Sequence, residues 1–155
     1  MGYVTPKKEP MSSCAKWNDD YSLGIKAIDD QHKMLFEMIN KLCSVLEKDV
    51  TPRTFNGKVV LDKITEEILD EMSEYASNHF FLEESYFQEF HYEKTEEHMA
   101  QHELFRLKIH SLREELEKGN ENVAFETLSF LSNWFVRHIL HYDREYVECF
   151  HKHGL

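Results

Sequence analysis

The sequence predicts an all-α protein, an antiparallel up-down-up-down four-helix bundle with an N-terminal arm. Four long segments repeat apolar residues every three or four positions, and short links separate them, the first and last of which contain Gly, Asn or Pro. No segment keeps the two-residue alternation of a strand, and only 5 Gly and 3 Pro interrupt 155 residues. This length suits one domain, so we expect an N-terminal extension over 1–16 and the bundle over 17–155.

The apolar periodicity places four helices in order along the chain. Their predicted ranges are about 29–47, 58–88, 96–118 and 123–150. Pro52 and the Asn-Gly pair at 56–57 are expected to separate the first two helices, and the Gly-Asn pair at 119–120 the last two, because Gly and Asn commonly end helices. Residues 90–94 link the middle pair. The residues from 17 to 23 are expected to lie over the bundle as an arm.

Composition argues against several kinds of partner. The net charge of −11 disfavours binding to nucleic acid or to an anionic membrane surface, since like charges repel. No stretch approaches the roughly 20 apolar residues that cross a bilayer, and the N-terminus has no apolar core of a secretory signal. The cysteines, Cys14, Cys43 and Cys149, are odd in number and far apart, so we expect free thiols and a cytoplasmic location.

Polar residues interrupt the apolar helix faces, and most of them are histidines. They are His32, His79, Glu83, His98, His102 and His138. The pairs on the second and third helices are four residues apart, so each pair can aim at one point. A single buried histidine usually bonds to a backbone carbonyl. Six polar residues facing one core need a common partner, because an unsatisfied buried group costs about 1–3 kcal/mol.

Spacing also predicts that these residues lie at one level of the bundle. In an antiparallel hairpin, residues at the same level are equidistant from the turn. The midpoints between successive polar groups, with Asp143 included on the fourth helix, fall at 56–57, 90–91 and 120. All three lie in predicted links. Five imidazoles and two carboxylates are too many donors for one tetrahedral zinc ion and suit two six-coordinate metals, with iron, manganese, zinc or copper all compatible.

Several motifs share one family pattern. They are Gln31-His32, His79-Phe80, Glu83-Glu84, the HxxxH pair at 98–102 and the WxxxHIxxxxD block at 134–143. With these motifs the sequence resembles the hemerythrin family, and most closely its single-domain bacterial members, over nearly the whole chain from Trp17 to Tyr146. The resemblance implies a non-haem centre of two iron ions, Fe2+ or Fe3+, with an oxo or hydroxo bridge.

The family pattern also implies a role for each ligand. One iron would bind His98, His102 and His138, the other His32 and His79, and both would share Glu83 and Asp143. The second iron would keep an open position where O2 binds and is reduced to the peroxide level. Ile28, Phe135 and Ile139 are expected to line the O2 pocket. Phe135 stands where the family often carries Leu, so its larger ring could narrow the pocket or slow ligand entry and autoxidation.

Asp143 does not fit a regular helix. It lies five residues after His138, about 140° around an ideal helix axis. Either its side chain reaches sideways along the bundle, or the helix contains a π-bulge at this point, which is common at functional sites. We predict the bulge. Regular hydrogen bonds four residues apart throughout 138–143 would contradict it.

The remaining polar residues are expected to face solvent. They are Glu84 and the histidines at 91, 110, 141, 151 and 153. The function expected is reversible O2 binding, as carrier, store, supplier or sensor, and not catalysis. The alternative is a di-iron oxidase, a ferroxidase, or an enzyme that consumes peroxide or NO. A protein partner that receives O2 stays open.

Overall fold

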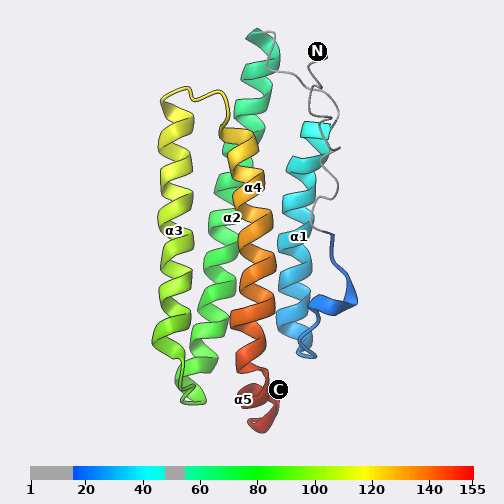
Figure 1. The fold of residues 1–155 in the computed structure, drawn as a ribbon, viewed down its shortest axis with the longest axis vertical. Helices are drawn as coiled ribbons and strands as arrows, with labels where there is room; N and C mark the ends of the chain where they lie inside the picture. The colour runs from blue at the N-terminus through cyan, green and yellow to red at the C-terminus, as the bar shows by residue number, and fades with distance from the viewer. Residues whose placement is uncertain (1–15, 48–54) are drawn as a thin grey trace, which may run out of the picture.

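The computed structural model describes residues 16–47 and 55–155, and all regular elements in these ranges are helical (Figure 1). The elements are the 3-10 turn η1 (Asp19–Tyr21), α1 (Lys26–Glu47), α2 (Phe55–Glu89), α3 (Thr95–Glu117), α4 (Val123–Arg137), the π-helix η2 (His138–Asp143) and α5 (Arg144–Lys152). The four long helices lie side by side, and η2 and α5 continue α4. The predicted four-helix bundle is confirmed. The proposed boundary after residue 16 stays a prediction.

The link between α3 and α4 is the one predicted. Gly119 has a φ of +80°, a left-handed conformation that glycine adopts without a Cβ penalty. Its N–H donates to the Leu116 carbonyl at 3.0 Å, and the Asn120 N–H donates to the Glu115 carbonyl at 3.1 Å. These two bonds satisfy carbonyls that the end of α3 would otherwise leave without partners.

The predicted break at the Asn-Gly pair 56–57 is wrong, because α2 already begins at Phe55. A glycine inside a helix costs only about 1 kcal/mol, which long-range contacts can offset. One such contact is the Lys58 Nζ, which donates to the Gly119 carbonyl at 3.3 Å. In Figure 1 the start of α2 extends past the end of α1. Pro52, the other residue expected in this link, lies outside the described residues.

The interior has two apolar clusters with a polar layer between them. The first cluster is built from the later part of α1, the middle of α2, α3 and α4, and it includes Ile39, Met72 and Phe105. The second combines the start of α1 with the end of the bundle and includes Phe87 and Phe150. The buried histidines and carboxylates lie between these clusters along each helix. The fold therefore places the predicted site in the interior.

The predicted N-terminal arm packs against α1 and α5. The rings of Trp17 and Tyr21 lie 5.9 and 5.0 Å from that of Phe36. Asp29 accepts hydrogen bonds from the Ser22 hydroxyl at 2.6 Å and from the backbone N–H at position 23 at 2.8 Å. The Arg144 guanidinium donates to the carbonyl of residue 20. The arm thus packs along α1 and reaches the start of α5.

The cysteines correct one expectation. Cys149 is free, as predicted, but Cys43 is disulfide-bonded, so the prediction of a free thiol there is wrong. Cys14 lies outside the described residues. Spacing in sequence could not show this, because a disulfide depends on which thiols meet in space.

Among the described helices, none is long and apolar enough to cross a membrane.

The contact between the arm and α1 predicts a large loss of stability for Phe36→Ala. Phe36 is 1% exposed, and removing a buried phenylalanine ring leaves a cavity worth about 3–5 kcal/mol. Phe81→Ala, the same change at a 71% exposed ring, should alter the free energy of unfolding by no more than about 0.5 kcal/mol. Urea denaturation of both variants measures the difference. Equal losses would contradict the burial of Phe36 between the arm and α1.

Candidate metal centre

The helix that carries His138 and Asp143 changes its winding between them. Residues His138–Asp143 form a π-helix, and the Arg144 N–H donates to the carbonyl of Ile139, five residues earlier. The wider turn brings residues five apart close to one face. The Asp143 Oδ1 accordingly lies 2.9 Å from the His138 Nε2. The predicted π-bulge is confirmed.

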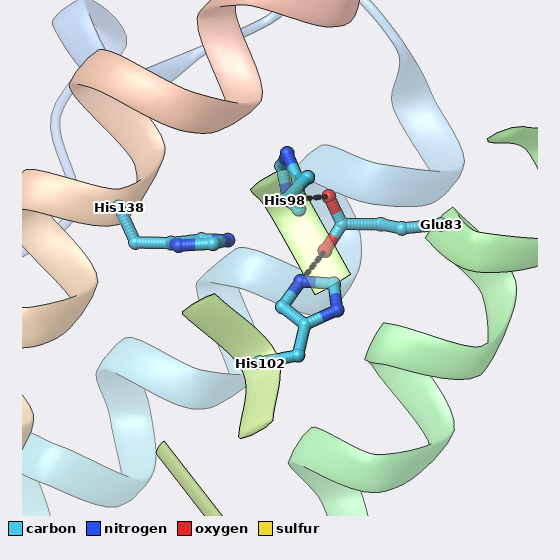
Figure 2. Close-up of side chains that lie close together, drawn as sticks. All are labelled: Glu83, His98, His102 and His138. Carbon is cyan, nitrogen blue, oxygen red and sulfur yellow. Dashed lines mark ion pairs between the residues drawn. The ribbon is translucent and has the colours of Figure 1, made fainter. Parts of the chain in front are cut away.

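Three histidines and one glutamate form a first group (Figure 2). His98 and His102 come from α3, His138 from the start of η2, and Glu83 from α2. The Glu83 oxygens lie 3.5 Å from the His98 Nε2 and 3.6 Å from the His102 Nε2. Figure 2 shows the Glu83 carboxylate between these two rings, with His138 pointing toward them.

Two histidines and two carboxylates form a second group, namely His32, His79, Glu83 and Asp143. The His79 Nε2 lies 2.8 Å from a Glu83 oxygen, and the His32 Nε2 lies 3.1 Å from an Asp143 oxygen. The two imidazoles are also close, at 3.0 Å between their Nε2 atoms. In each group the possible ligand atoms lie within 4.8 Å of one another.

Both carboxylates contact histidines of both groups. Glu83 contacts His79 as well as the histidines of α3, and Asp143 contacts His32, His98 and His138. All seven side chains are buried, with exposures of 2% or less. The residues that the sequence pattern predicts at one level of the bundle do meet there. The two groups, with shared carboxylates between them, fit a binuclear metal site.

The polar atoms of the site also fit metal ions because they lack other partners. Nine buried atoms of these side chains make no hydrogen bond, and two of them are the Nδ1 atoms of His32 and His138. The other seven are both oxygens of Glu83, both oxygens of Asp143, and the Nε2 atoms of His98, His102 and His138. Each such atom would cost about 1–3 kcal/mol if it stayed unsatisfied. Carboxylate oxygens and imidazole nitrogens are ligands that first-row metals accept, and two ions would satisfy them together.

The charges of the site perturb its pKa values. Burial lowers the pKa of His98, but the contacts with the Asp143 and Glu83 carboxylates outweigh burial and raise it to about 10. Burial raises the pKa of both carboxylates, yet the surrounding imidazoles hold both below their usual values. In the metal-free protein, protonation of His98 and His79 therefore offsets part of the negative charge of the two carboxylates.

Three neighbours of the site were not predicted. The Gln31 amide oxygen lies 2.6 Å from the His79 Nδ1, and the Glu84 carboxylate lies 3.0 Å from the His102 Nδ1. The expectation that Glu84 faces solvent is wrong, because the 100° step from Glu83 turns it toward α3. Tyr146, taken as an apolar-face residue, is fully buried, and its hydroxyl lies near Glu83. Of these three residues, only Glu84 could have been suspected from the sequence, because it directly follows Glu83.

The other histidines are all exposed, as predicted: His91, His110, His141, His151 and His153. The three residues expected in the O2 pocket, Ile28, Phe135 and Ile139, are buried at 1% exposure or less. Ile28 and Ile139 belong to one apolar cluster and Phe135 to the other. They therefore border the polar layer from both sides. Their role in an O2 pocket stays a prediction.

The fold and these two groups define a helical-bundle protein with a buried site for a pair of metal ions. The family model "Hemerythrin HHE cation binding domain" matches residues 23–150, so the chain belongs to the hemerythrin family. The bacteriohemerythrin of Clostridium acetobutylicum is 35% identical over 133 residues, covering 85% of this chain and 98% of that protein. Similarity extends to the bacteriohemerythrins of Pseudomonas aeruginosa, 33% identical with 86% and 79% covered, and Methylococcus capsulatus, 28% identical with 84% and 91% covered.

The raised pKa of His98 predicts how the metal-free protein responds to pH. A histidine whose pKa rises from 6.5 to about 10 on folding stabilises the fold fully below pH 6.5 and loses this contribution as pH approaches 10. The midpoint of thermal unfolding should therefore fall over this range. For protein loaded anaerobically with Fe2+, this midpoint should fall less over the same range, because the ions replace the proton. Parallel pH curves for the two forms would contradict the prediction.

Proposed function

We propose that this protein binds O2 reversibly at two iron ions, and that it acts as an oxygen carrier, store, supplier or sensor rather than as an enzyme. As metal ligands we propose His32, His79, Glu83, His98, His102, His138 and Asp143. One observation carries the proposal: three imidazoles lie in one group and two in the other, while both carboxylates contact both groups. The two-histidine position therefore has one protein donor fewer, which leaves room for O2.

The residues around the site favour binding without loss of peroxide. Iron would supply the electrons that O2 takes up on binding and returns on release. The protein contributes exclusion of water, since the ligand side chains are at most 2% exposed. Ile28 lies one turn from His32, and Phe135 and Ile139 flank His138 with fully apolar side chains. A dry apolar border gives few protons to reduced O2, so O2 can leave again.

The balance of donors supports binding over oxidation chemistry. Di-iron oxidases of the ferritin-like class use about four carboxylates and two histidines. Here five imidazoles accompany two carboxylates, so the donors carry less negative charge and stabilise high-valent iron less well.

The cellular location and the partners of this protein stay predictions. We expected a cytoplasmic location, and the disulfide at Cys43 removes one of the arguments for it, because disulfides are rare in a reducing compartment. We likewise expect O2 as the ligand, no nucleic acid and no membrane insertion. A protein that takes up the O2 remains a proposal that co-purification under low oxygen would test.

Repeated oxygenation of the reduced protein tests the proposal. Anaerobically reduced, iron-loaded protein should gain visible absorption bands when O2 is added and lose them when O2 is removed under argon. Stopped-flow absorbance should show the same amplitude over several cycles. Loss of amplitude in the first cycle, with release of hydrogen peroxide, would favour the oxidase alternative instead.

A pair of histidine variants tests the ligand assignment. His79→Ala removes one of the two imidazoles at the proposed O2 position and should abolish the oxygenated spectrum. His110→Ala is the matched control, because the His110 side chain is 73% exposed and pairs with the exposed Glu114 at 3.1 Å. Its iron content and spectrum should match those of the unaltered protein. Equal loss in both variants would overturn the assignment.

A further inference from the structure

The two groups differ in the side chain that contacts the Nδ1 atom of a histidine, on the ring edge that faces away from Glu83. The His102 Nδ1 lies 3.0 Å from the Glu84 carboxylate, whereas the His79 Nδ1 lies 2.6 Å from the Gln31 amide oxygen. In both rings the Nε2 faces Glu83, at 3.6 and 2.8 Å. In Figure 2 one nitrogen of His102 meets Glu83 and the other points toward α2, the helix that carries Glu84. In each group one imidazole is thus held at its Nδ1 atom. The charged Glu84 carboxylate holds His102, and the neutral Gln31 amide holds His79.

Water and positively charged side chains compete little with His102 for the Glu84 carboxylate. The Glu84 side chain is only 19% exposed, and within the described residues it pairs with no Lys or Arg. His102 is fixed from its face as well, because the Phe80 ring stacks on it at 3.8 Å and 10°. Arg106 lies over that same phenylalanine ring, 5.4 Å from its centre, and pairs with Glu103 at 3.4 Å. Partial shielding from water strengthens the carboxylate–imidazole bond.

We propose that Glu84 and Gln31 are positioning residues that make the two metal positions unequal. A carboxylate that accepts the Nδ1 proton fixes the tautomer and makes the Nε2 a stronger donor, and an amide does so more weakly. Glu84 therefore strengthens the three-histidine position, while Gln31 leaves the two-histidine position the weaker one. This inference rests on the proposed function only in requiring two bound metal ions.

The unequal donors have a consequence for the order of metal loading. The first ion should fill the position of His98, His102 and His138, and the second should bind less tightly at His32 and His79. In the iron form the same difference favours the oxidised state first at the three-histidine position. The carboxylate pair on α2 thus has divided roles: Glu83 faces both metal positions, and Glu84 acts on one of them through His102.

Zn2+ titration of the metal-free protein tests this inference without O2 or redox chemistry. Competition with a chromophoric chelator should resolve two binding constants. Glu84→Gln keeps an acceptor but removes the charge, and should weaken the tighter constant about 10- to 100-fold while leaving the other within about twofold. Gln31→Glu should strengthen the weaker constant. In the double variant the gap between the two constants should narrow by about 100-fold or more.

Controls separate this effect from damage to the fold. Glu89→Gln makes the same charge change on the same helix at an exposed position and should alter neither constant. A gain of affinity in Gln31→Glu cannot arise from partial unfolding. Nuclear magnetic resonance of the His102 Nδ1 proton should show a changed chemical shift in Glu84→Gln alone. The inference is overturned if Glu84→Gln behaves as Glu89→Gln does, or weakens both constants equally. Failure of reversible oxygenation would leave these results unchanged.

Discussion

The burial of two carboxylates among five imidazoles is the constraint on which the rest of the structure depends. Apolar clusters lie on both sides of this layer and cannot satisfy its polar atoms. The seven side chains must therefore meet at one level, where metal ions can take the place of water. That requirement sets the register of the four helices, the length of the links between them and the change of winding in the fourth. Stability of the fold and occupancy of the site are consequently coupled.

Much of this arrangement could be predicted from the sequence, because the patterns are long and repeat on every helix. Apolar residues at three- and four-residue spacing predicted the four helices, and the polar interruptions on those faces predicted the layer. The five-residue step from His138 to Asp143 predicted the π-helix, since no regular helix places both on one face. Iron and O2 came from family resemblance, because imidazole and carboxylate are ligands for several metals.

The errors share a physical origin in contacts between distant parts of the chain. The Asn-Gly pair at 56–57 has a strong local preference for a turn, yet it lies inside α2, whose start reaches the α3–α4 link. Glu84 follows an inward-facing glutamate and was assigned to solvent, although the neighbouring helix supplies His102 as its partner. The disulfide of Cys43 likewise depends on a meeting in space. The local sequence pattern does not show which distant residues come into contact.

The π-helix has a consequence for the chain beyond the site. Its wider turn accommodates one residue more than an α-helix would, so the segments before and after it are out of phase by one position. α5 buries Tyr146 and Phe150 only because of that offset. Winding the same residues as a regular α-helix would rotate everything after this segment by about 100°. Such a change would remove Asp143 from the centre and both rings from the core at once. Deleting one residue within 139–142, by contrast, would leave His138 and the aspartate four residues apart, a spacing that a regular α-helix also places on one face.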